Sequence, residues 1–319
     1  MLSYTIRRIM IILAMLFVAC FLIYLCLDLM PGDPISYMVD QETLGEMTDV
    51  QKEAMRQSLG LNGSVITRFF NWFRGILHGD FGYSLTSGVA INKIIADTLP
   101  ATIELSIAAL LFSSIVGTVL GILSALKKGC VVDNVLTVAG LIGMSIPQFF
   151  FGLVALLIFS INLGWLPIGG RMEAGQSAFF QRLPHLVLPA IVLGLFLTAG
   201  IMRYARSSML DAANKDFLRT ARSKGIPEWR VNLIHGFRVA MNPVVVLIGL
   251  RLPMLIGGSV VIESVFQWPG IGKMFLVAVR GQNYPLVMMI ALLMIFATMV
   301  SSFLIDLLTA AMDPRVRLE

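Results

Sequence analysis

Long apolar runs recur along the chain and decide what it can fold into. Hydrophobic residues make up 57% of the 319 residues and charged residues only 13%, about half the charged share of an ordinary soluble domain. A helix crosses a bilayer core of about 30 Å with about 20 apolar residues. Six such runs lie near residues 9–29, 101–126, 134–163, 184–203, 242–262 and 285–308. The sequence therefore predicts an all-helical, polytopic membrane protein.

Details within the runs refine this expectation. Pro147 in the third run, which is long for one crossing, predicts a kink or a tilt, and Pro189 predicts a kink in the fourth. The first run continues past Cys20 to Leu29, too long for the core of a signal peptide, so we expect it to remain as a span. The three cysteines indicate neither a disulfide framework nor a metal site. A small-residue face, "GTVLG" at residues 117–121, favours close helix packing.

The distribution of Lys and Arg predicts the orientation of the spans. Both termini and the segments around residues 127–128 and 203–238 together carry fourteen of these cations, whereas the three opposite segments carry nine over many more residues. Cytoplasmic loops are enriched in Lys and Arg. We therefore expect both termini and residues 206–240 to lie in the cytoplasm, and residues 31–98 to lie outside it.

The segment of residues 31–98 has mixed character. Residues 45–61 are typical of a polar helix, and residues 65–77 combine aromatic side chains with Arg68 and Arg74, as an amphipathic helix at a membrane interface does. Two interpretations stay open for this segment: a lid packed on the helical bundle, or a docking surface for an outside partner.

One basic segment interrupts the apolar second half: "DFLRTARSKGIPEWRVNLIHGFR", residues 216–238, which we call the basic segment. Strong helix formers from residue 211 onward predict a helix that ends at Gly225, a residue suited to a left-handed stop. Pro227 prevents its continuation and suits the first turn of a second helix, where Glu228 lies near the positive end of the dipole. The expected structure is a helix, a sharp turn and a helix.

This hairpin is more structured than a loop that only sets topology. We expect Phe217, Leu218 and Ala221 on one side of its first helix and the cations on the other. Apolar residues exposed in the cytosol are expected to be covered by a partner. The residues alone leave two interpretations open, a protein-docking surface and a charge anchor at the membrane.

The basic segment resembles the cytoplasmic loop of ABC importer permeases, and most closely that of the oligopeptide/dipeptide/nickel permease family. Its "RTARSKG" (residues 219–225) carries the likeness, together with Asn242-Pro243. Arg219-Thr220-Ala221 stands where the general importer motif has Glu-Ala-Ala, a departure typical of the peptide branch, and Asn242 replaces the usual Leu. Further segments resemble the same family in the same order: "MPGDP" (30–34), "HGDFGYS" (78–84), "LPATIEL" (99–105), "RSSMLD" (206–211), "VIESVFQWPGIGK" (261–273), "NYPLV" (283–287) and "DPRVR" (313–317).

The resemblance implies a type I ABC importer transmembrane domain with six spans and an extracytoplasmic segment after the first. It also implies a heterodimer with a related permease, two cytoplasmic ATPase subunits that bind ATP and Mg²⁺, and an extracytoplasmic substrate-binding protein. The chain has no Gly-rich phosphate-binding loop of its own, so it is expected to bind no cofactor. The ATPase-coupling residues would be Asp216, Phe217, Leu218, Arg219, Thr220, Ala221, Arg222, Lys224, Gly225, Ile226 and Pro227.

Two further groups of residues are candidates for transport. Arg251 falls near the middle of the fifth run, where a charge is costly and indicates a water-filled path or a buried partner. We expect Arg251 and Met254 to line the translocation path, with a structural ion pair as the alternative for Arg251. The resemblance places the loop with Glu263, Trp268, Pro269 and Gly270 near an outer gate and the receptor, whereas an interfacial Trp and a turn is the simpler reading.

The resemblance implies import of di- or oligopeptides across a bacterial or archaeal cytoplasmic membrane. The alternatives are the same machine with nickel or a metal chelate as cargo, and an ion-coupled secondary transporter. Nothing indicates catalysis or nucleic-acid binding, because the three histidines are scattered and no basic and aromatic residues alternate as a stacking platform requires.

Overall fold

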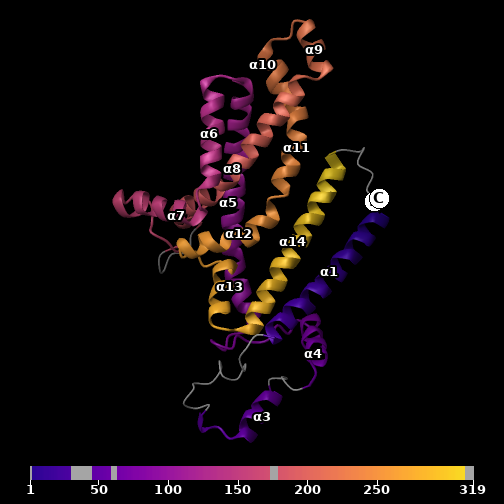
Figure 1. Cartoon of the computed structure of the whole chain (residues 1–319), viewed down its shortest axis with the longest axis vertical. Coiled ribbons are helices and arrows are strands. Elements are labelled where there is room, and N and C mark those ends of the chain that lie inside the picture. The colour runs from indigo at the N-terminus through magenta and orange to yellow at the C-terminus, as the bar shows by residue number, and fades with distance from the viewer. Residues whose placement is uncertain (1, 30–44, 59–62, 173–178, 313–319) are drawn as a thin grey trace. The chain divides into compact units, whose positions relative to one another are not determined.

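The structure is a computed structural model that describes residues 2–29, 45–58, 63–172 and 179–312 (Figure 1). Almost all of these residues are helical. The elements in chain order are α1 (Leu2–Asp28), α3 (Asp49–Ser58), α4 (Val65–Leu77), α5 (Ile91–Leu126), α6 (Val131–Ser145), α7 (Gln148–Ala155), the π-helical η2 (Leu156–Asn162), α8 (Phe179–Ala213), α9 (Asp216–Ser223), α10 (Glu228–Arg230), the π-helical η3 (Val231–Gly236), α11 (Phe237–Gly249), α12 (Leu252–Val265), α13 (Ile271–Arg280) and α14 (Tyr284–Met312).

Five helices in the described part of the chain are long and apolar enough to cross a membrane: Ile6–Cys26, Ile91–Leu126, Phe180–Ala213, Glu228–Gly249 and Tyr284–Thr309. The bent pair Val131–Ser145 and Gln148–Asn162 supplies a sixth crossing if it counts as one span. The only β-type pairing among the described residues is an isolated bridge between Tyr83 and Ala90. The expected all-helical membrane fold is confirmed.

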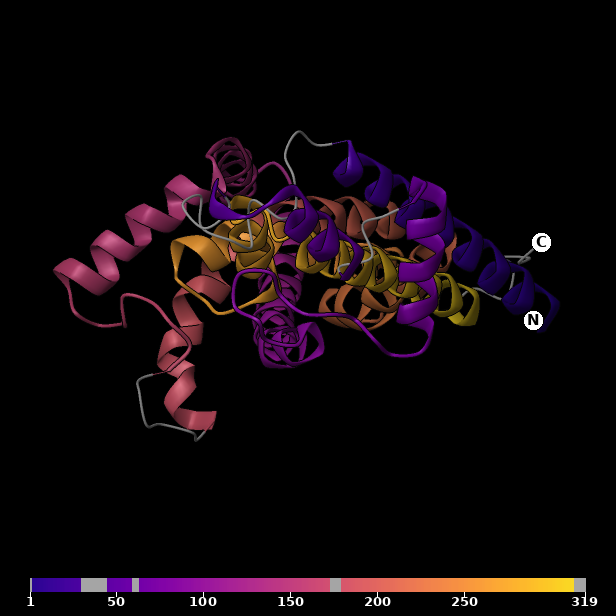
Figure 2. The ribbon, with the colours of Figure 1, turned by 90° about the horizontal axis from the view of Figure 1, so that it is seen from below.

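The third run is broken at its proline, as predicted. Ile146 has the extended backbone that a residue before proline prefers, so α6 ends at Ser145 and α7 starts after Pro147. The two halves meet at 101°, a bend that is seen from two directions in Figures 1 and 2. In contrast, α8 continues through Pro184 and Pro189 as one unbroken helix.

The fifth run is not one continuous helix, which corrects the expected span of residues 242–262. α11 ends at Gly249, Leu250 and Arg251 form a turn, and α12 begins at Leu252. The sequence explains the break: the proline at position 253 falls in the first turn of α12, and proline disfavours a helix that continues through it from the preceding turn. On the other side, η3 and α11 continue directly from α10, so part of the basic segment belongs to a long helix.

The chain forms two compact units. The first comprises Met1–Pro100 and Gly270–Met299, and the second Ala101–Pro269 and Val300–Glu319. In the first unit α13 and α14 pack against the start of α5, with Ile91, Ile271 and Ile290 fully buried. The buried amide of Asn283 joins α14 to the loop after α4, since it accepts from the Leu85 N–H at 3.2 Å and donates to Ser84 Oγ at 2.7 Å.

The amphipathic helix predicted at residues 65–77 is α4, and its aromatic face packs on α1. The fully buried ring of Phe69 makes edge contacts with Phe17 and Phe21 at 5.6 and 5.1 Å between centroids. Arg68 pairs with Asp28 of α1 at 2.8 Å. These contacts favour the interpretation of α4 as a packed lid over that of a free docking surface.

The second unit is organised around α8, which crosses α5 at very short range. A Cβ on Gly121 would come within 2.5 Å of the Met202 carbonyl oxygen, and one on Gly117 within 2.9 Å of Ile201 Cβ. The predicted packing role of this small-residue face is confirmed. Nearby, Leu105, Ile262, Phe266 and Trp268 belong to one core cluster that α5, α7, α8 and α12 share.

Candidate functional site

The basic segment begins beyond the end of α8, and its α9, α10 and η3 form a small hairpin that leads into α11 (Figure 1). α8 ends at Ala213, and Lys215 has an extended backbone before α9 begins at Asp216. The continuous helix expected from residue 211 to Gly225 is therefore wrong. The residues explain the break, because Asn214 is a weak helix former and Asp216 is favoured in a first turn, where it faces the positive end of the helix dipole.

Gly225 ends α9 as the sequence predicts. Its φ of +75° lies in the left-handed region, which glycine enters without the steric penalty that a Cβ brings. The Gly225 N–H donates to the Arg222 carbonyl at 2.9 Å, and the Ile226 N–H donates to the Ala221 carbonyl at 3.3 Å. These are the two hydrogen bonds of a Schellman motif. Pro227 follows as the residue just before α10.

A small apolar core holds the two arms of the hairpin together. Leu218 and Ala221 of α9 and Val231 of η3 are buried, with Ile226 packed against them. Residues three apart on a helix share a face, which explains why Leu218 and Ala221 point inward together. Phe217, expected on that side as well, is 45% exposed, so this expectation is wrong.

Polar contacts also join the two arms of the hairpin across the turn, and one of them connects the hairpin to α8. Arg222 Nε donates to a Glu228 carboxylate oxygen at 2.9 Å, and Arg222 Nη1 donates to the Ala213 carbonyl at 3.3 Å. Glu228 also accepts from Asn232 Nδ2 at 3.2 Å. Exposed ion pairs contribute only about 0–1 kcal/mol. The apolar core and the Schellman hydrogen bonds therefore account for most of the hairpin's rigidity.

The outer surface of the hairpin combines exposed apolar side chains with cations. Phe217, Trp229, Leu233 and Ile234 are each between 45% and 56% exposed. The Arg230 guanidinium lies 5.2 Å from the centre of the Trp229 ring. Arg219 and Lys224 are exposed as well. Aromatic residues and Arg are enriched in protein interfaces, so this surface is suited to contact with another protein.

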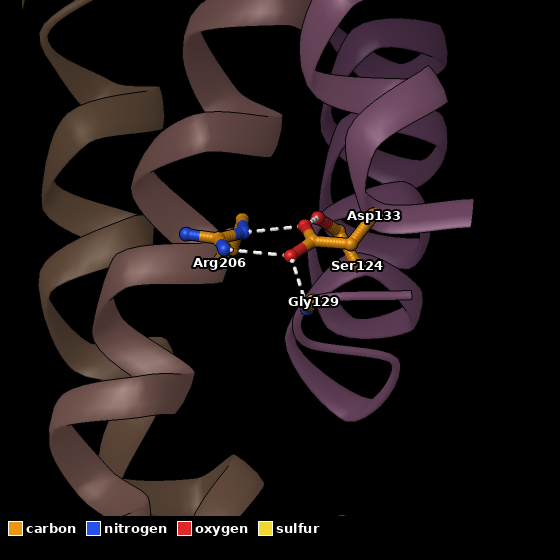
Figure 3. Close-up of polar contacts among 4 residues, drawn as sticks. All are labelled: Ser124, Gly129, Asp133 and Arg206. Atoms are coloured by element: carbon orange, nitrogen blue, oxygen red, sulfur yellow. Dashed lines mark hydrogen bonds and ion pairs between the residues drawn. The ribbon is translucent and has the colours of Figure 1, made fainter. Parts of the chain in front are cut away.

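A buried charge cluster lies further along α8 and was not predicted from the sequence (Figure 3). The Asp133 carboxylate, at the start of α6, accepts from Arg206 of α8 through Nε at 2.7 Å and Nη2 at 2.8 Å. It also accepts from Ser124 Oγ near the end of α5 and from the Gly129 N–H in the turn between α5 and α6. One carboxylate thus joins two helices and a turn to α8.

Arg251 lies in the turn between α11 and α12, where its guanidinium contacts α8. A Cβ on Gly200 would come within 2.9 Å of Arg251 Nη2, so the absence of a side chain there makes room for the cation. Arg251 is partly buried. The side chain of Met254, its predicted companion on the translocation path, is outside the described side chains.

Comparisons with known proteins identify the family. A family model described as the N-terminal part of binding-protein-dependent transport system membrane components matches residues 1–106. The model described as the binding-protein-dependent transport system inner membrane component matches residues 117–318. The chain belongs to this family of inner-membrane transport components. The family predicted from the basic segment is confirmed.

Full-length relatives agree with this membership. The permease is 36% identical over 319 residues to the oligopeptide transport system permease protein AppB of Bacillus subtilis. It is 33% identical over 336 residues to the di/tripeptide transport system permease protein DppB of Pseudomonas aeruginosa, and 33% identical over 317 residues to the glutathione transport system permease protein GsiC of Escherichia coli K12. In each comparison 99% of both chains is covered.

The loop expected near the outer gate of the permease is largely buried. Glu263 accepts from Thr102 Oγ1 at 2.7 Å and from Ser259 Oγ at 2.9 Å, and its side chain is fully enclosed. Trp268 is fully buried as well, and its Nε1 donates to the Ala101 carbonyl at 2.8 Å. Gly270 is buried, and only Pro269 of the four predicted residues is exposed. Glu263 and Trp268 therefore fix the shape of the loop rather than present a surface.

Among the described residues of the permease, no group of three or more His, Cys, Asp or Glu side chains is placed to hold a metal ion. The three cysteines are present as thiols.

Proposed function

We propose that this permease is one of two membrane subunits of an ATP-driven importer of di- and oligopeptides. The assignment of a peptide cargo is supported by similarity over the full length to permeases named for oligopeptides, di/tripeptides and glutathione, the last itself a tripeptide. The other subunit is a related but different permease. Together the two subunits enclose the translocation path and move peptides inward by alternating access.

The energy comes from two separate cytoplasmic subunits that bind ATP and Mg²⁺. The absence of a Gly-rich phosphate-binding loop from the sequence supports this division of labour. The family description, which names dependence on a binding protein, supports an extracytoplasmic protein that delivers the peptide. The excess of Lys and Arg at both termini and around residues 203–238 supports cytoplasmic ends and a cytoplasmic basic segment.

In this proposal the basic segment is the contact for an ATPase subunit. Its surface offers the exposed ring of Phe217 beside Arg219 and Lys224, while Leu218, Ala221 and Val231 keep its shape fixed. A rigid hairpin moves as a body when the ATPase subunits close on ATP, whereas a flexible loop would absorb the displacement. Rotation of the spans then switches the path from inward-facing to outward-facing.

Arg251 and Met254 are proposed to line the path, and the loop around Pro269 to face the binding protein. The break between α11 and α12 supports the role of Arg251, because it places a cation where two helix ends meet and where Gly200 leaves space. A cation at this position is suited to attract the carboxylate of a peptide.

Uptake of labelled solutes by proteoliposomes tests the proposal. The complete complex and its binding protein are supplied with ATP and with either ¹⁴C-labelled trialanine or ⁶³Ni²⁺. We expect peptide uptake that requires both ATP hydrolysis and the binding protein. Nickel uptake without peptide uptake would contradict the proposed peptide cargo. Uptake driven by an ion gradient without ATP would contradict the proposed ATP-driven mechanism.

A further inference from the structure

We propose that Arg206 and Asp133 form a rigid joint that transmits movement of the basic segment to the hairpin formed by α5 and α6. Both are positioning residues, since they act through the helices that they join. This inference rests on the proposed function. It adds the residues through which displacement of the basic segment reaches the membrane helices.

The geometry of the pair favours a joint over a loose contact. Two nitrogens of one guanidinium bind two oxygens of one carboxylate, at 2.7 and 2.8 Å. Such a bidentate pair fixes orientation as well as distance. The Asp133 side chain is only 4% exposed, so water competes little for its oxygens. Loss of the guanidinium would leave a buried charge without its counter-ion, which is strongly unfavourable.

The remaining bonds of Asp133 extend the joint into α5. Ser124 Oγ near the end of α5 and the Gly129 N–H both donate to the carboxylate. Gly129 has a φ of +76°, so it closes the turn in a conformation that favours glycine. α5, the turn and α6 therefore share one fixed point, and that point is attached to α8.

Packing on either side of the pair prevents α8 from sliding against α5. On the side of Arg206 away from the basic segment, Gly117 and Gly121 let α5 approach α8 closely. A Cβ on Gly117 would lie 2.9 Å from Ile201 Cβ, and one on Gly121 would lie 2.5 Å from the Met202 carbonyl oxygen. Beyond Arg206, Ala125 of α5, Met209 and Ala212 of α8, and Ala240 of α11 form one cluster. The pair thus lies between two tight contacts of the same helices.

The joint is also connected to the basic segment by continuous structure. α8 runs without a break from Arg206 to Ala213, about two helical turns. There the Ala213 carbonyl accepts from Arg222 Nη1 of α9. A displacement applied to α9 therefore reaches Arg206 along one helix and passes through Asp133 to α5 and α6.

Distance measurements on the assembled complex test rigidity directly. Spin labels are placed on the exposed Cys130, beside the joint, and on an introduced Lys215→Cys, with Cys20→Ala and Cys26→Ser removing the other thiols. We expect the same label-to-label distance without nucleotide and with ATP trapped by vanadate. A shift of about 5 Å or more, the size of a one-turn displacement, would overturn the rigid joint.

A transport measurement tests whether the joint couples. In proteoliposomes, Arg206→Leu should lower ¹⁴C-trialanine uptake per ATP hydrolysed about tenfold, with Arg206→Lys intermediate, because Lys keeps the charge but lacks the bidentate fork. Arg203→Leu, an exposed position on the same helix, is the matched control and should keep the wild-type ratio. A wild-type ratio in Arg206→Leu would overturn the inference while the wild-type complex still transports peptide. Absence of wild-type uptake would instead count against the proposed function.

If Arg206→Leu yields no assembled complex, two other measurements decide the question. A lowered uptake per ATP hydrolysed in Arg206→Lys, together with an unchanged distance between the two spin labels in the otherwise wild-type protein, supports the joint. Uptake and ATP hydrolysis that fall together in Arg206→Lys, with the ratio unchanged, would reduce the pair to a structural role and overturn the proposal.

Discussion

Arg222 of α9 and Glu228 of α10 face each other across the Gly225 turn, with Nε and a carboxylate oxygen 2.9 Å apart. The same guanidinium reaches the last carbonyl of α8, so one side chain contacts both arms of the hairpin and the helix that carries it. Together with the buried Leu218 and Val231, this gives the basic segment a defined shape. A defined shape is what the proposed contact with an ATPase subunit requires.

Replacing Gly225 tests the turn. Gly225→Val should lower uptake about tenfold or more while the protein still inserts, because a β-branched residue is strongly disfavoured at a φ of +75°. Gly225→Asn should retain most uptake, since Asn tolerates the left-handed region. Trialanine uptake and the amount of permease in the membrane are measured together. Normal uptake by Gly225→Val at full expression would exclude a role for the turn in coupling.

Phe217 and Leu218 are adjacent but should behave differently. Leu218 is fully buried, and Leu218→Ala should destabilise the hairpin by about 2–5 kcal/mol, as a cavity in a packed core does. Limited proteolysis of the permease should then cleave within residues 214–236. Phe217→Ala should leave that cleavage unchanged, because the ring is exposed.

The effect of Phe217→Ala should instead be on the partner. Loss of an aromatic anchor in an interface commonly costs more than about 1 kcal/mol, so the ATPase subunits should bind about fivefold or more weakly. Titration of purified ATPase subunits onto the permease in detergent measures this affinity. Equal affinity for Phe217→Ala and the wild type would place the contact elsewhere on the hairpin.

Arg251→Leu tests the translocation path. Removal of the cation should change peptide uptake without loss of the ATPase subunits from the purified complex, because Arg251 lies in the turn between α11 and α12, outside the basic segment. Gly200→Ala should have an effect in the same direction, since its Cβ would occupy space within 2.9 Å of Arg251 Nη2. If uptake is unchanged in both variants, Arg251 does not line the path.

Trp268→Phe tests the buried loop. It removes the Nε1–H that the Ala101 carbonyl accepts at 2.8 Å. Ala101 lies within α5, where its carbonyl also accepts a helical hydrogen bond, so the loss is that of one buried hydrogen bond, about 0.5–1.5 kcal/mol. Thermal unfolding in detergent should therefore occur at a lower Tm. Trp165→Phe is the matched control, since Trp165 is 69% exposed. An equal Tm for both variants would show that the Trp268 hydrogen bond does not stabilise the loop.

Local chemistry was predictable from the sequence. Gly225 was expected to stop a helix in the left-handed region, and Pro147 to break the third run, because each residue restricts its own backbone wherever it occurs. Pro253 carries the same kind of signal and would have predicted the break at Leu250 and Arg251. The outward position of Phe217 was missed because spacing within one helix does not show which of its sides the second arm of the hairpin covers.

Long-range pairing was not predictable in this way. Asp133 and Arg206 are 73 residues apart, and nothing in either local pattern selects one as the partner of the other. From its local pattern, Asp133 is only a favourable charge in the first turn of a helix, and Arg206 is only one more cation of a segment expected in the cytoplasm. Only the packing of α6 against α8 brings them together. Trp268 and Ala101, 167 residues apart, are likewise brought together only by the tertiary fold.

Site-specific crosslinking tests the central claim most directly. Benzoylphenylalanine replaces Phe217 in the assembled complex, which is then irradiated in native membranes. The account predicts a covalent product of the permease with an ATPase subunit. It predicts none when the same analogue replaces Phe180, which is 79% exposed in the segment assigned to the outer side. An ATPase crosslink from Phe180, or crosslinks from Phe217 to the extracytoplasmic binding protein or to lipid alone, would contradict the account.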